Sequence, residues 1–396
     1  MDYLRKNTCY IYILLWMVYN LQEMLMITGT LARLVLALLM SFTFYTFYEV
    51  NVHYKICPYL KWVNVMLLVF TVYGIIPVIG GWTLIGNWHM ESTRSYVYLQ
   101  NIFMSILPIY AFYYFTLKRQ INGDNVTYIF VAFFVYSVLS FYQRYVLASE
   151  QSGMEEITNN MGYYFVPLIP MLYLVKLREW VKYVFLMIII AYIMMAMKRG
   201  AILVGMIMLL LFMYHQFNKI STKHAVYLCM LSCAVSLATY RFTSNLYDSS
   251  SYFKGRVEQT KSGDASKRYE IYSRCYNHFV NKTTPGEFLI GNGANATIVL
   301  LGVYAHNDWL EIAVNQGILG VLLYLAYWFL FFMEWKNYRG PTSCRHTLGS
   351  VIVAYFMISL FSMSIDCMPI AATLCIGYSL AVSVRQRLVE EYLVCS

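Results

Sequence analysis

Long apolar runs recur along nearly the whole chain, and no other sequence feature constrains the fold as strongly. An α-helix needs about 20 apolar residues to cross the ~30 Å hydrocarbon core of a bilayer. Runs close to this length lie at residues 9–26, 29–49, 60–80, 97–116, 126–147, 161–175, 181–197, 200–217, 224–240, 310–334, 347–364 and 368–385. The sequence therefore predicts an all-α polytopic membrane protein with about 12 transmembrane helices.

The amino-acid composition excludes an ordinary soluble domain. Of the 396 residues, 60% are hydrophobic and only 12% are charged, and 24 Phe, 38 Tyr and 8 Trp suit helix ends anchored among lipid headgroups. The formal net charge of +9 comes from Lys and Arg scattered between the apolar runs rather than gathered on one face. We therefore expect the lipid bilayer, and no nucleic acid, as a partner.

The nine cysteines do not form the pattern of a disulfide framework, because most of them lie in or beside apolar runs. Cys275 is the only one in the long polar segment. Cys229 and Cys233 lie four residues apart with no His or carboxylate nearby, which favours packing over a metal site.

The distribution of Lys and Arg predicts the topology. With a cytoplasmic N-terminus, the inside segments hold sixteen basic residues and the short outside segments five, as the positive-inside rule requires. The basic pair Arg5 and Lys6 has no small-residue cleavage site after it, so we expect the first run to be retained as a span. The predicted parts are N-terminal transmembrane helices 1–9 (residues 1–240), an external periplasmic loop (241–308) and C-terminal transmembrane helices 10–12 (309–396), with both termini cytoplasmic.

The external loop combines a Ser-rich half with an amphipathic segment. From about Ser266, the residues Arg268, Ile271, Tyr272, Cys275 and Phe279 recur at helical spacing, which predicts a helix lying against the outer face of the membrane. The stretch "TTPGEFLIGNGANA" that follows is interpreted as turns and loop, because Pro and Gly interrupt it repeatedly. Its Gly291-x-Gly293 pair is too short to indicate a phosphate-binding loop.

Lys198 and Arg199 stand between two strongly apolar runs, on the predicted outer side. Ionisable side chains at such a place are candidates for function. The alternative is a tight hairpin whose charges reach the lipid headgroups. The residues alone support both readings equally.

A second polar group, His306, Asn307 and Asp308, precedes the run at 310–334. Asn307 is a good helix cap, and Asp308 and Glu311 have the spacing of a capping box. Capping does not require His306. A His before a helix N-terminus is held in its neutral form, which can accept a proton, so His306 is either a general base or an ordinary surface residue.

These segments resemble the O-antigen ligase and polymerase superfamily. The resemblance is carried by "FLIGNGAN" and, after a gap, "HNDWLEIAVNQGILGVLLYL", with His306, Asn307, Leu310, Gly317 and Gly320 at the positions of the family pattern. The stretch "KRGA" at 198–201 is similar to a Ser-Arg-Gly element of the family, although Lys198 replaces the usual Ser or Thr.

The resemblance implies a multi-pass glycosyltransferase of the bacterial inner membrane that needs no metal or other cofactor. Such an enzyme moves an oligo- or polysaccharide from undecaprenyl diphosphate to an acceptor hydroxyl on the outer face. The acceptor is lipid A-core for a lipopolysaccharide ligase, or another glycan for an O-antigen or capsule polymerase.

The resemblance also implies roles for particular residues. His306 would be the catalytic base and Asn307 would orient it or the sugar. Arg199 and Arg268 would bind the donor diphosphate, because guanidinium groups suit phosphate oxygens, with Arg256 a weaker third. Gly317 and Gly320 would permit close helix packing.

Two other classes of protein compete with this interpretation. A flippase or other secondary transporter would carry ionisable residues near the bilayer midplane and an internal repeat. Here the polar candidates gather at the outer end and we find no repeat. A purely structural membrane protein would leave Lys198, Arg199 and His306 unexplained.

Overall fold

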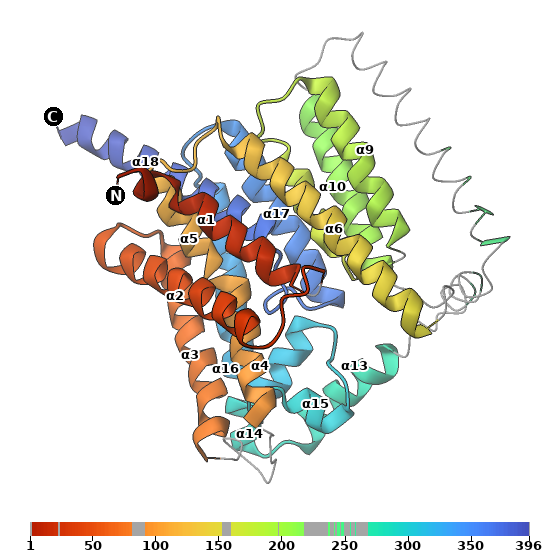
Figure 1. The fold of residues 1–396 in the computed structure, drawn as a ribbon. Coiled ribbons are helices and arrows are strands. Elements are labelled where there is room, and N and C mark those ends of the chain that lie inside the picture. Colours follow the sequence, from red (N-terminus) through yellow and green to blue (C-terminus); the bar gives the residue numbers. More distant parts are fainter. Residues whose placement is uncertain are drawn as a thin grey trace. The chain divides into compact units, whose positions relative to one another are not determined.

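The computed structural model describes residues 2–22, 24–80, 92–152, 160–196, 198–217 and 268–395, with isolated positions between 237 and 258. Regular structure in these ranges is helical throughout (Figure 1). The chain divides into two compact units, and each is described by itself. Unit 1 comprises Met1–Leu39, Arg119–Asp264 and Thr342–Ala354, and unit 2 comprises Met40–Lys118, Ala265–Pro341 and Tyr355–Ser396.

Two helices, α2 (Gly29–His53) and α17 (Thr342–Phe361), begin in unit 1 and end in unit 2. The other helices of unit 1 are α1 (Asp2–Asn20), α6 (Val126–Ser152), α7 (Gly162–Phe165), α8 (Leu168–Met171), α9 (Glu179–Met195) and α10 (Arg199–Phe217). Those of unit 2 are α3 (Pro58–Gly80), α4 (Ser92–Ile106), α5 (Pro108–Leu117), α13 (Arg268–Asn277), the π-helical turn η2 (His278–Lys282), α14 (Pro285–Ile290), α15 (Ala296–Leu301), α16 (Asp308–Lys336) and α18 (Ile370–Cys395).

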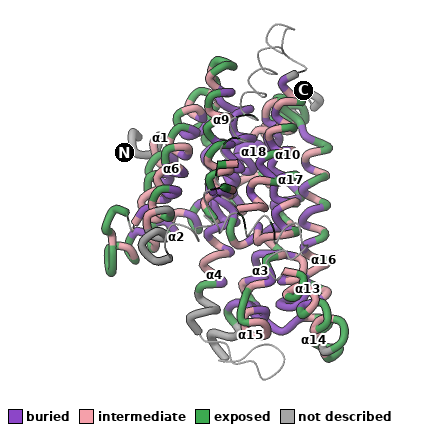
Figure 2. Tube along the Cα trace, turned by 90° about the vertical axis from the view of Figure 1, so that its right-hand side faces the viewer, coloured by how far each residue is buried: buried purple, intermediate pink, exposed green. Residues whose placement is uncertain are grey.

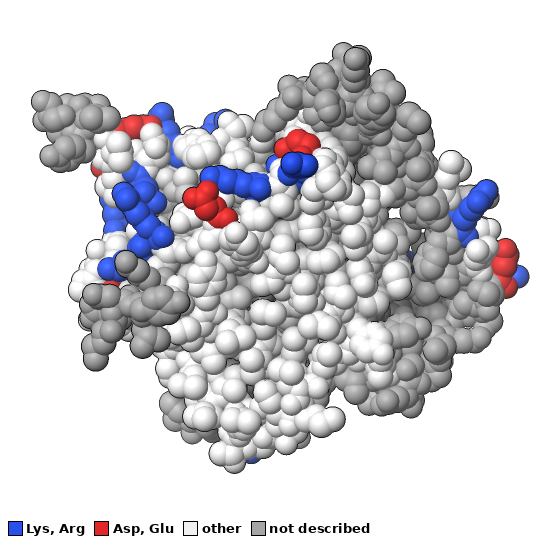
Figure 3. Space-filling model, turned by 45° about the horizontal axis from the view of Figure 1, so that its top comes forward, with Lys and Arg blue, Asp and Glu red and all other residues white. Residues whose placement is uncertain are grey.

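Six helices in the described ranges are long and apolar enough to cross a membrane, namely α2, α3, α6, α10, α16 and α17. Large apolar side chains such as Leu68, Leu210 and Phe329 are exposed on them, as expected for surfaces that face lipid. The face in Figure 3 carries its Lys, Arg, Asp and Glu in small groups and leaves wide stretches uncharged. The prediction of an all-helical membrane protein is confirmed, whereas the count of twelve spans stays a prediction.

Prolines break two of the expected spans. The run at 97–116 forms α4 and α5, which are separated at Leu107 because Pro108 cannot donate a backbone hydrogen bond. The run at 161–175, which holds Pro167 and Pro170, forms only the short helices α7 and α8. Neither run therefore forms one uninterrupted helix. The run at 224–240 lies outside the described residues apart from Leu237.

The core of unit 2 forms where α5 packs against α18, whose first half is buried along its length (Figure 2). Gly377 of α18 makes this approach possible, since a Cβ there would lie 2.4 Å from the carbonyl oxygen of Ile109. Tyr110 is fully buried, and its hydroxyl donates to the Leu60 carbonyl at 3.0 Å and to Asn64 Oδ1 at 2.6 Å. These contacts attach α5 to α3, and α3 lines the pocket described next through Phe70.

Candidate functional site

The start of α16 is a capped helix N-terminus, as predicted. The Asn307 side chain accepts a hydrogen bond from the Leu310 amide at 3.1 Å, and its Nδ2 donates to the Leu360 carbonyl at 2.7 Å. Asn307 therefore begins α16 and also attaches it to the end of α17.

Asp308 does not act as a cap, so the capping-box interpretation is wrong. Its buried carboxylate accepts from the Ser364 amide at 3.0 and 3.1 Å, from the Ser364 hydroxyl at 2.5 Å and from the Tyr324 hydroxyl at 2.7 Å. Asp308 thus holds the segment between α17 and α18 against α16. That long-range role was not visible in local spacing.

Glu311 is the other residue of the expected capping box, and it too is buried. It accepts from the Thr297 hydroxyl, from the Ala305 amide at 2.8 Å and from Asn315 Nδ2 at 3.2 Å. The Thr297 amide in turn donates to Asn315 Oδ1 at 3.2 Å. This network ties α15 and the segment before α16 to the first turns of α16.

A break at Gly317 divides α16, where φ is 65° and ψ is −164°. The freed carbonyls of Val314 and Asn315 accept hydrogen bonds from the amides of Asn292 at 3.0 Å and Gly293 at 2.9 Å. The approach is close, because a Cβ on Gly317 would lie 2.5 Å from the Gly291 nitrogen. The Gly-Asn-Gly stretch at 291–293 therefore supplies the hydrogen-bond donors that the break in α16 requires.

The structure changes the interpretation of two further segments. The stretch expected as turns and loop contains α14, which begins with a capping box between Thr284 and Glu287 that places Pro285 in the first helical turn, and it ends at the first residue of α15. Gly320 was expected to permit close packing of a second helix. A Cβ at this position would instead contact Gln316 and Ile312 of α16 itself.

The amphipathic helix predicted from about Ser266 is confirmed as α13. Its apolar side packs against protein, and its place at the outer face of the membrane stays a prediction. Cys275 is 1% exposed and shares a cluster with Ala296, Ala305 and Val314, against which Ile271 also packs. Burial raises the pKa of the Cys275 thiol to about 12.

Arg268, Tyr272, His306 and Asn307 come together in unit 2 at the C-terminal end of α17. Arg268 Nη1 donates to the Phe361 carbonyl at 2.6 Å, next to the Leu360 carbonyl that Asn307 binds. The Tyr272 hydroxyl donates to the His306 carbonyl at 3.3 Å and also interacts with Arg268 and Asn307. Sequence reasoning treated Tyr272 only as part of an apolar face and missed this linking role.

His306 has a φ of 53°, a left-handed backbone conformation that is uncommon for residues other than glycine. The residue is exposed, while its neighbours Ala305 and Asp308 are buried. The backbone thus presents the imidazole at the surface of the unit, directly before the capped start of α16.

Arg199 belongs to unit 1, where it is the first residue of α10. The Lys198 carbonyl accepts the first helical hydrogen bond from Ile202 at 3.0 Å. Gly162 of α7 packs so closely that a Cβ would lie 2.7 Å from Ala196 Cβ. The tight hairpin between α9 and α10 is therefore present, with Arg199 half-buried at its tip. Arg256 lies outside the described residues.

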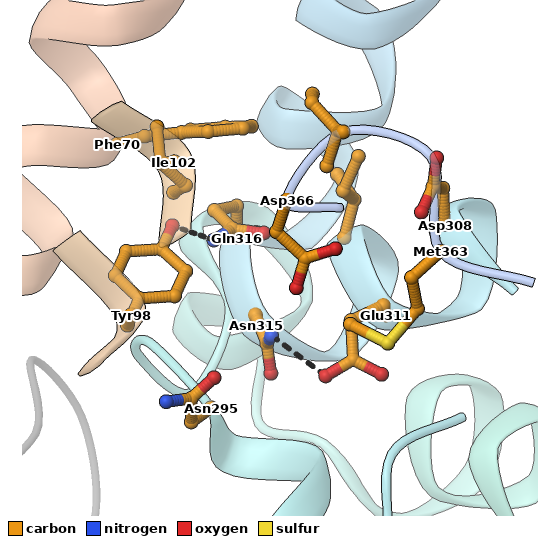
Figure 4. A pocket seen from close by; sticks show the side chains of 12 residues that line it. Phe70, Tyr98, Ile102, Asn295, Asp308, Glu311, Asn315, Gln316, Met363 and Asp366 are labelled. Carbon is orange, nitrogen blue, oxygen red and sulfur yellow. Dashed lines mark hydrogen bonds between the residues drawn. The ribbon is translucent and has the colours of Figure 1, made fainter. Parts of the chain in front are cut away.

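A pocket lies beside the first turns of α16, wholly within unit 2 (Figure 4). It is lined by Phe70, Tyr98, Ile102, Asn295, Asp308, Glu311, Ile312, Asn315, Gln316, Met363, Ile365 and Asp366. Burial, together with the nearby Asp308 and Glu311, raises the pKa of Asp366 to about 8. Among the residues that the structure describes, no group of three His, Cys, Asp or Glu is arranged to hold a metal ion.

Sequence reasoning missed the pocket residues Asp366, Gln316 and Tyr98. One signal was available for Asp366, which stands between the apolar runs at 347–364 and 368–385 just as Arg199 stands between two runs. Tyr98 carried no such signal, because its partner Gln316 is 218 residues away in the sequence.

Comparison with known protein families covers the middle part of the chain. A family model described as O-antigen ligase matches residues 184–325. The matched region contains Arg199, Arg256, Arg268, His306 and Asn307, which are all the site residues expected from the sequence. No curated protein matches the chain.

Proposed function

Because this chain belongs to the O-antigen ligase and polymerase superfamily, we propose that it moves an oligo- or polysaccharide from undecaprenyl diphosphate to an acceptor hydroxyl. The reaction takes place on the outer face of the bacterial inner membrane. The family match and the apolar helices support a multi-pass membrane glycosyltransferase, and the match gives no support to a flippase.

The proposed topology has twelve spans, both termini in the cytoplasm and residues 241–308 outside as a periplasmic loop between the helices of 1–240 and 309–396. The sixteen-to-five bias of basic residues supports it. The gathered residues Arg268, His306 and Asn307 then lie on the side where lipid-linked glycans are joined.

The observation that carries the proposal is the grouping of Arg268, Tyr272, His306 and Asn307 around the end of α17. Arg268 uses one nitrogen on the Phe361 carbonyl and keeps further N–H donors for phosphate oxygens. His306 is exposed beside it, where an acceptor hydroxyl can reach the imidazole. A cation for the leaving group and a base for the acceptor therefore lie in one place.

The transfer step breaks one bond and forms another. The bond between the anomeric carbon and the diphosphate oxygen breaks, and its electron pair leaves with undecaprenyl diphosphate. The acceptor oxygen bonds to the anomeric carbon, and His306 takes the hydroxyl proton. Asn307 orients His306 or the sugar while capping α16.

Arg199 and Arg256 complete the proposed binding of the donor diphosphate. Arg199 is at the start of α10, where the positive end of the helix dipole adds to its charge in attracting phosphate. Ligase and polymerase use the same donor and the same base, and they differ only in whether lipid A-core or another glycan supplies the hydroxyl.

The test is transfer by purified protein with its natural lipid-linked glycan, extracted from the cells that make the protein, as donor. Lipid A-core and a second copy of the glycan serve as alternative acceptors, with a chelator present and no nucleotide sugar. The expected result is a longer or transferred glycan with release of undecaprenyl diphosphate. Loss of all transfer under these conditions would contradict the proposal.

A further inference from the structure

The pocket beside α16 contains three carboxylates, and two of them are fully engaged by the protein. Asp308 accepts hydrogen bonds from Ser364 and Tyr324. Glu311 accepts from Thr297, Ala305 and Asn315. These two groups hold the walls of the pocket together and have little capacity left for a ligand.

Two other oxygens in the pocket are buried and, within the described part of the chain, have no hydrogen-bond donor. They are Asp366 Oδ1 and Gln316 Oε1. Gln316 is 2% exposed, and its Nε2 donates to the Tyr98 hydroxyl at 2.9 Å, which fixes the orientation of the amide. Leaving a buried acceptor unpaired costs about 1–3 kcal/mol, so such oxygens point to a partner that binds there.

The lining residues restrict the chemistry of that partner. Among the residues that the structure describes, the pocket is lined by carboxylates and by no Lys or Arg, so a phosphate or another anion would be repelled. Phe70, Ile102, Ile312, Met363 and Ile365 supply apolar walls. A ligand that fits has hydroxyl donors at its edge and apolar C–H faces, which describes an uncharged sugar ring.

The place of the pocket agrees with that description. Asp308, which lines the pocket, follows the candidate base His306 by two residues. Figure 4 shows Asp366, Gln316 and Tyr98 reaching toward the same space.

We propose that this pocket binds one uncharged sugar residue of the glycan substrate, with sugar hydroxyls donating to Asp366 Oδ1 and Gln316 Oε1. The inference rests on the proposed glycan transfer. It adds a site that would select among sugars. One residue of this site, Asp366, lies outside the region that the family model matches. The sugar belongs either to the donor glycan or to the acceptor, since both present hydroxyl groups.

The protonation of Asp366 agrees with a neutral ligand. Because its pKa is raised to about 8, this carboxyl group keeps its proton at neutral pH, and it then carries one O–H donor beside its acceptor oxygen. A sugar hydroxyl both donates and accepts, so it matches such a group. The ionisable groups facing Asp366 from α16 and α4 are Asp308, Glu311 and Tyr98.

The first arm of the test measures binding without transfer. The probe is the water-soluble glycan released by mild acid from the lipid-linked material of the producing cells, titrated into purified full-length protein. The variants are Asp366→Ala and Gln316→Met, and the control is Asp124→Ala, at a side chain that is 81% exposed on unit 1. Thermal unfolding shows which variants fold, and Gln316→Met carries the arm if Asp366→Ala does not.

The expected result is that the parent and Asp124→Ala bind the glycan equally. Asp366→Ala and Gln316→Met should bind it about tenfold more weakly, because each loses a hydrogen bond to a buried group. Millimolar inorganic diphosphate should leave this binding unchanged. Absence of binding by the parent, equal binding by all folded variants or displacement by diphosphate would overturn the inference.

The second arm identifies the source of the sugar and separates the two proposals. In the transfer assay, Asp366→Ala should raise the KM for one substrate, and that substrate is the one that occupies the pocket. Transfer with both KM values unchanged overturns the pocket and leaves the proposed function standing. Glycan binding that depends on Asp366, in a protein that performs no transfer, supports the pocket and overturns the proposed function.

Discussion

Replacing Gly317 by Ala tests whether the break in α16 organises the site. With φ at 65° and ψ at −164°, Gly317 occupies a region that is essentially restricted to glycine, and another residue there costs about 1–3 kcal/mol. The added Cβ would also lie 2.5 Å from the Gly291 nitrogen and 2.6 Å from the Leu289 carbonyl oxygen. Relieving such overlap costs about 1–3 kcal/mol more, so the total loss of stability is about 2–6 kcal/mol.

Gly302 offers a matched control for this change. Its φ is also positive, at 74°, but a Cβ there would have nothing within 4 Å. Gly302→Ala therefore lowers the stability only through its backbone conformation, by about 1–2 kcal/mol. The difference between the two variants measures the packing of Gly291 and Leu289 against the break, together with the higher backbone cost at Gly317.

The assay is unfolding of purified protein in detergent, followed by glycan transfer at a temperature where each variant is folded. We expect Gly317→Ala to unfold well before Gly302→Ala and to transfer more slowly, because the contacts from Asn292 and Gly293 to α16 are displaced. Equal unfolding of the two variants would refute the reasoning that close packing requires glycine at this position.

Three further predictions follow from the site. When Cys275 is the single cysteine, an impermeant thiol reagent added to intact cells should not label it, because it is buried. When Tyr269→Cys is the single cysteine instead, the reagent should label it, because Tyr269 is 84% exposed. Labelling at position 269 only after lysis would place the loop inside the cell. Arg268→Lys keeps the charge but loses the planar fork, so transfer should fall at least about tenfold in a folded protein, and normal transfer would leave Arg268 a structural residue. The pKa of Asp366 is raised from 3.8 to about 8 in the folded state, so stability should fall as pH rises across that window, and thermal unfolding of Asp366→Asn should lack this part of the pH dependence; parallel curves for parent and variant would contradict it.

Local features of the sequence predicted much of the helical structure around the site. Asn307 as a cap and the amphipathic pattern from Arg268 to Phe279 both depend on neighbours within one or two turns, and both are present. The same local reasoning failed where prolines divide apolar runs. Pro108 separates α4 from α5, although the run at 97–116 has the length of one span.

The candidate site depends more on long-range contacts, which the sequence did not show. Asp308 and Glu311 have capping spacing, yet their carboxylates bind Ser364 and Thr297 respectively. Gly291 and Gly317 belong to the family pattern, but the sequence did not show why glycine is needed there. The structure shows that the backbones at these two positions lie in contact and leave no space for a Cβ. Periodicity describes one helix at a time, and a pocket requires several.

The most direct test of the central claim is transfer of lipid-linked glycan by purified His306→Ala. His53→Ala is the matched control, because the His53 side chain is 55% exposed in unit 2, on a different helix from the site. A positioned base contributes on the order of 10²–10⁴-fold, so the His306 variant should lose nearly all transfer while it still inserts, folds and binds donor. The control should retain normal transfer. If folded His306→Ala transfers glycan within a few-fold of the parent rate, His306 is not the base and the account of this site is wrong.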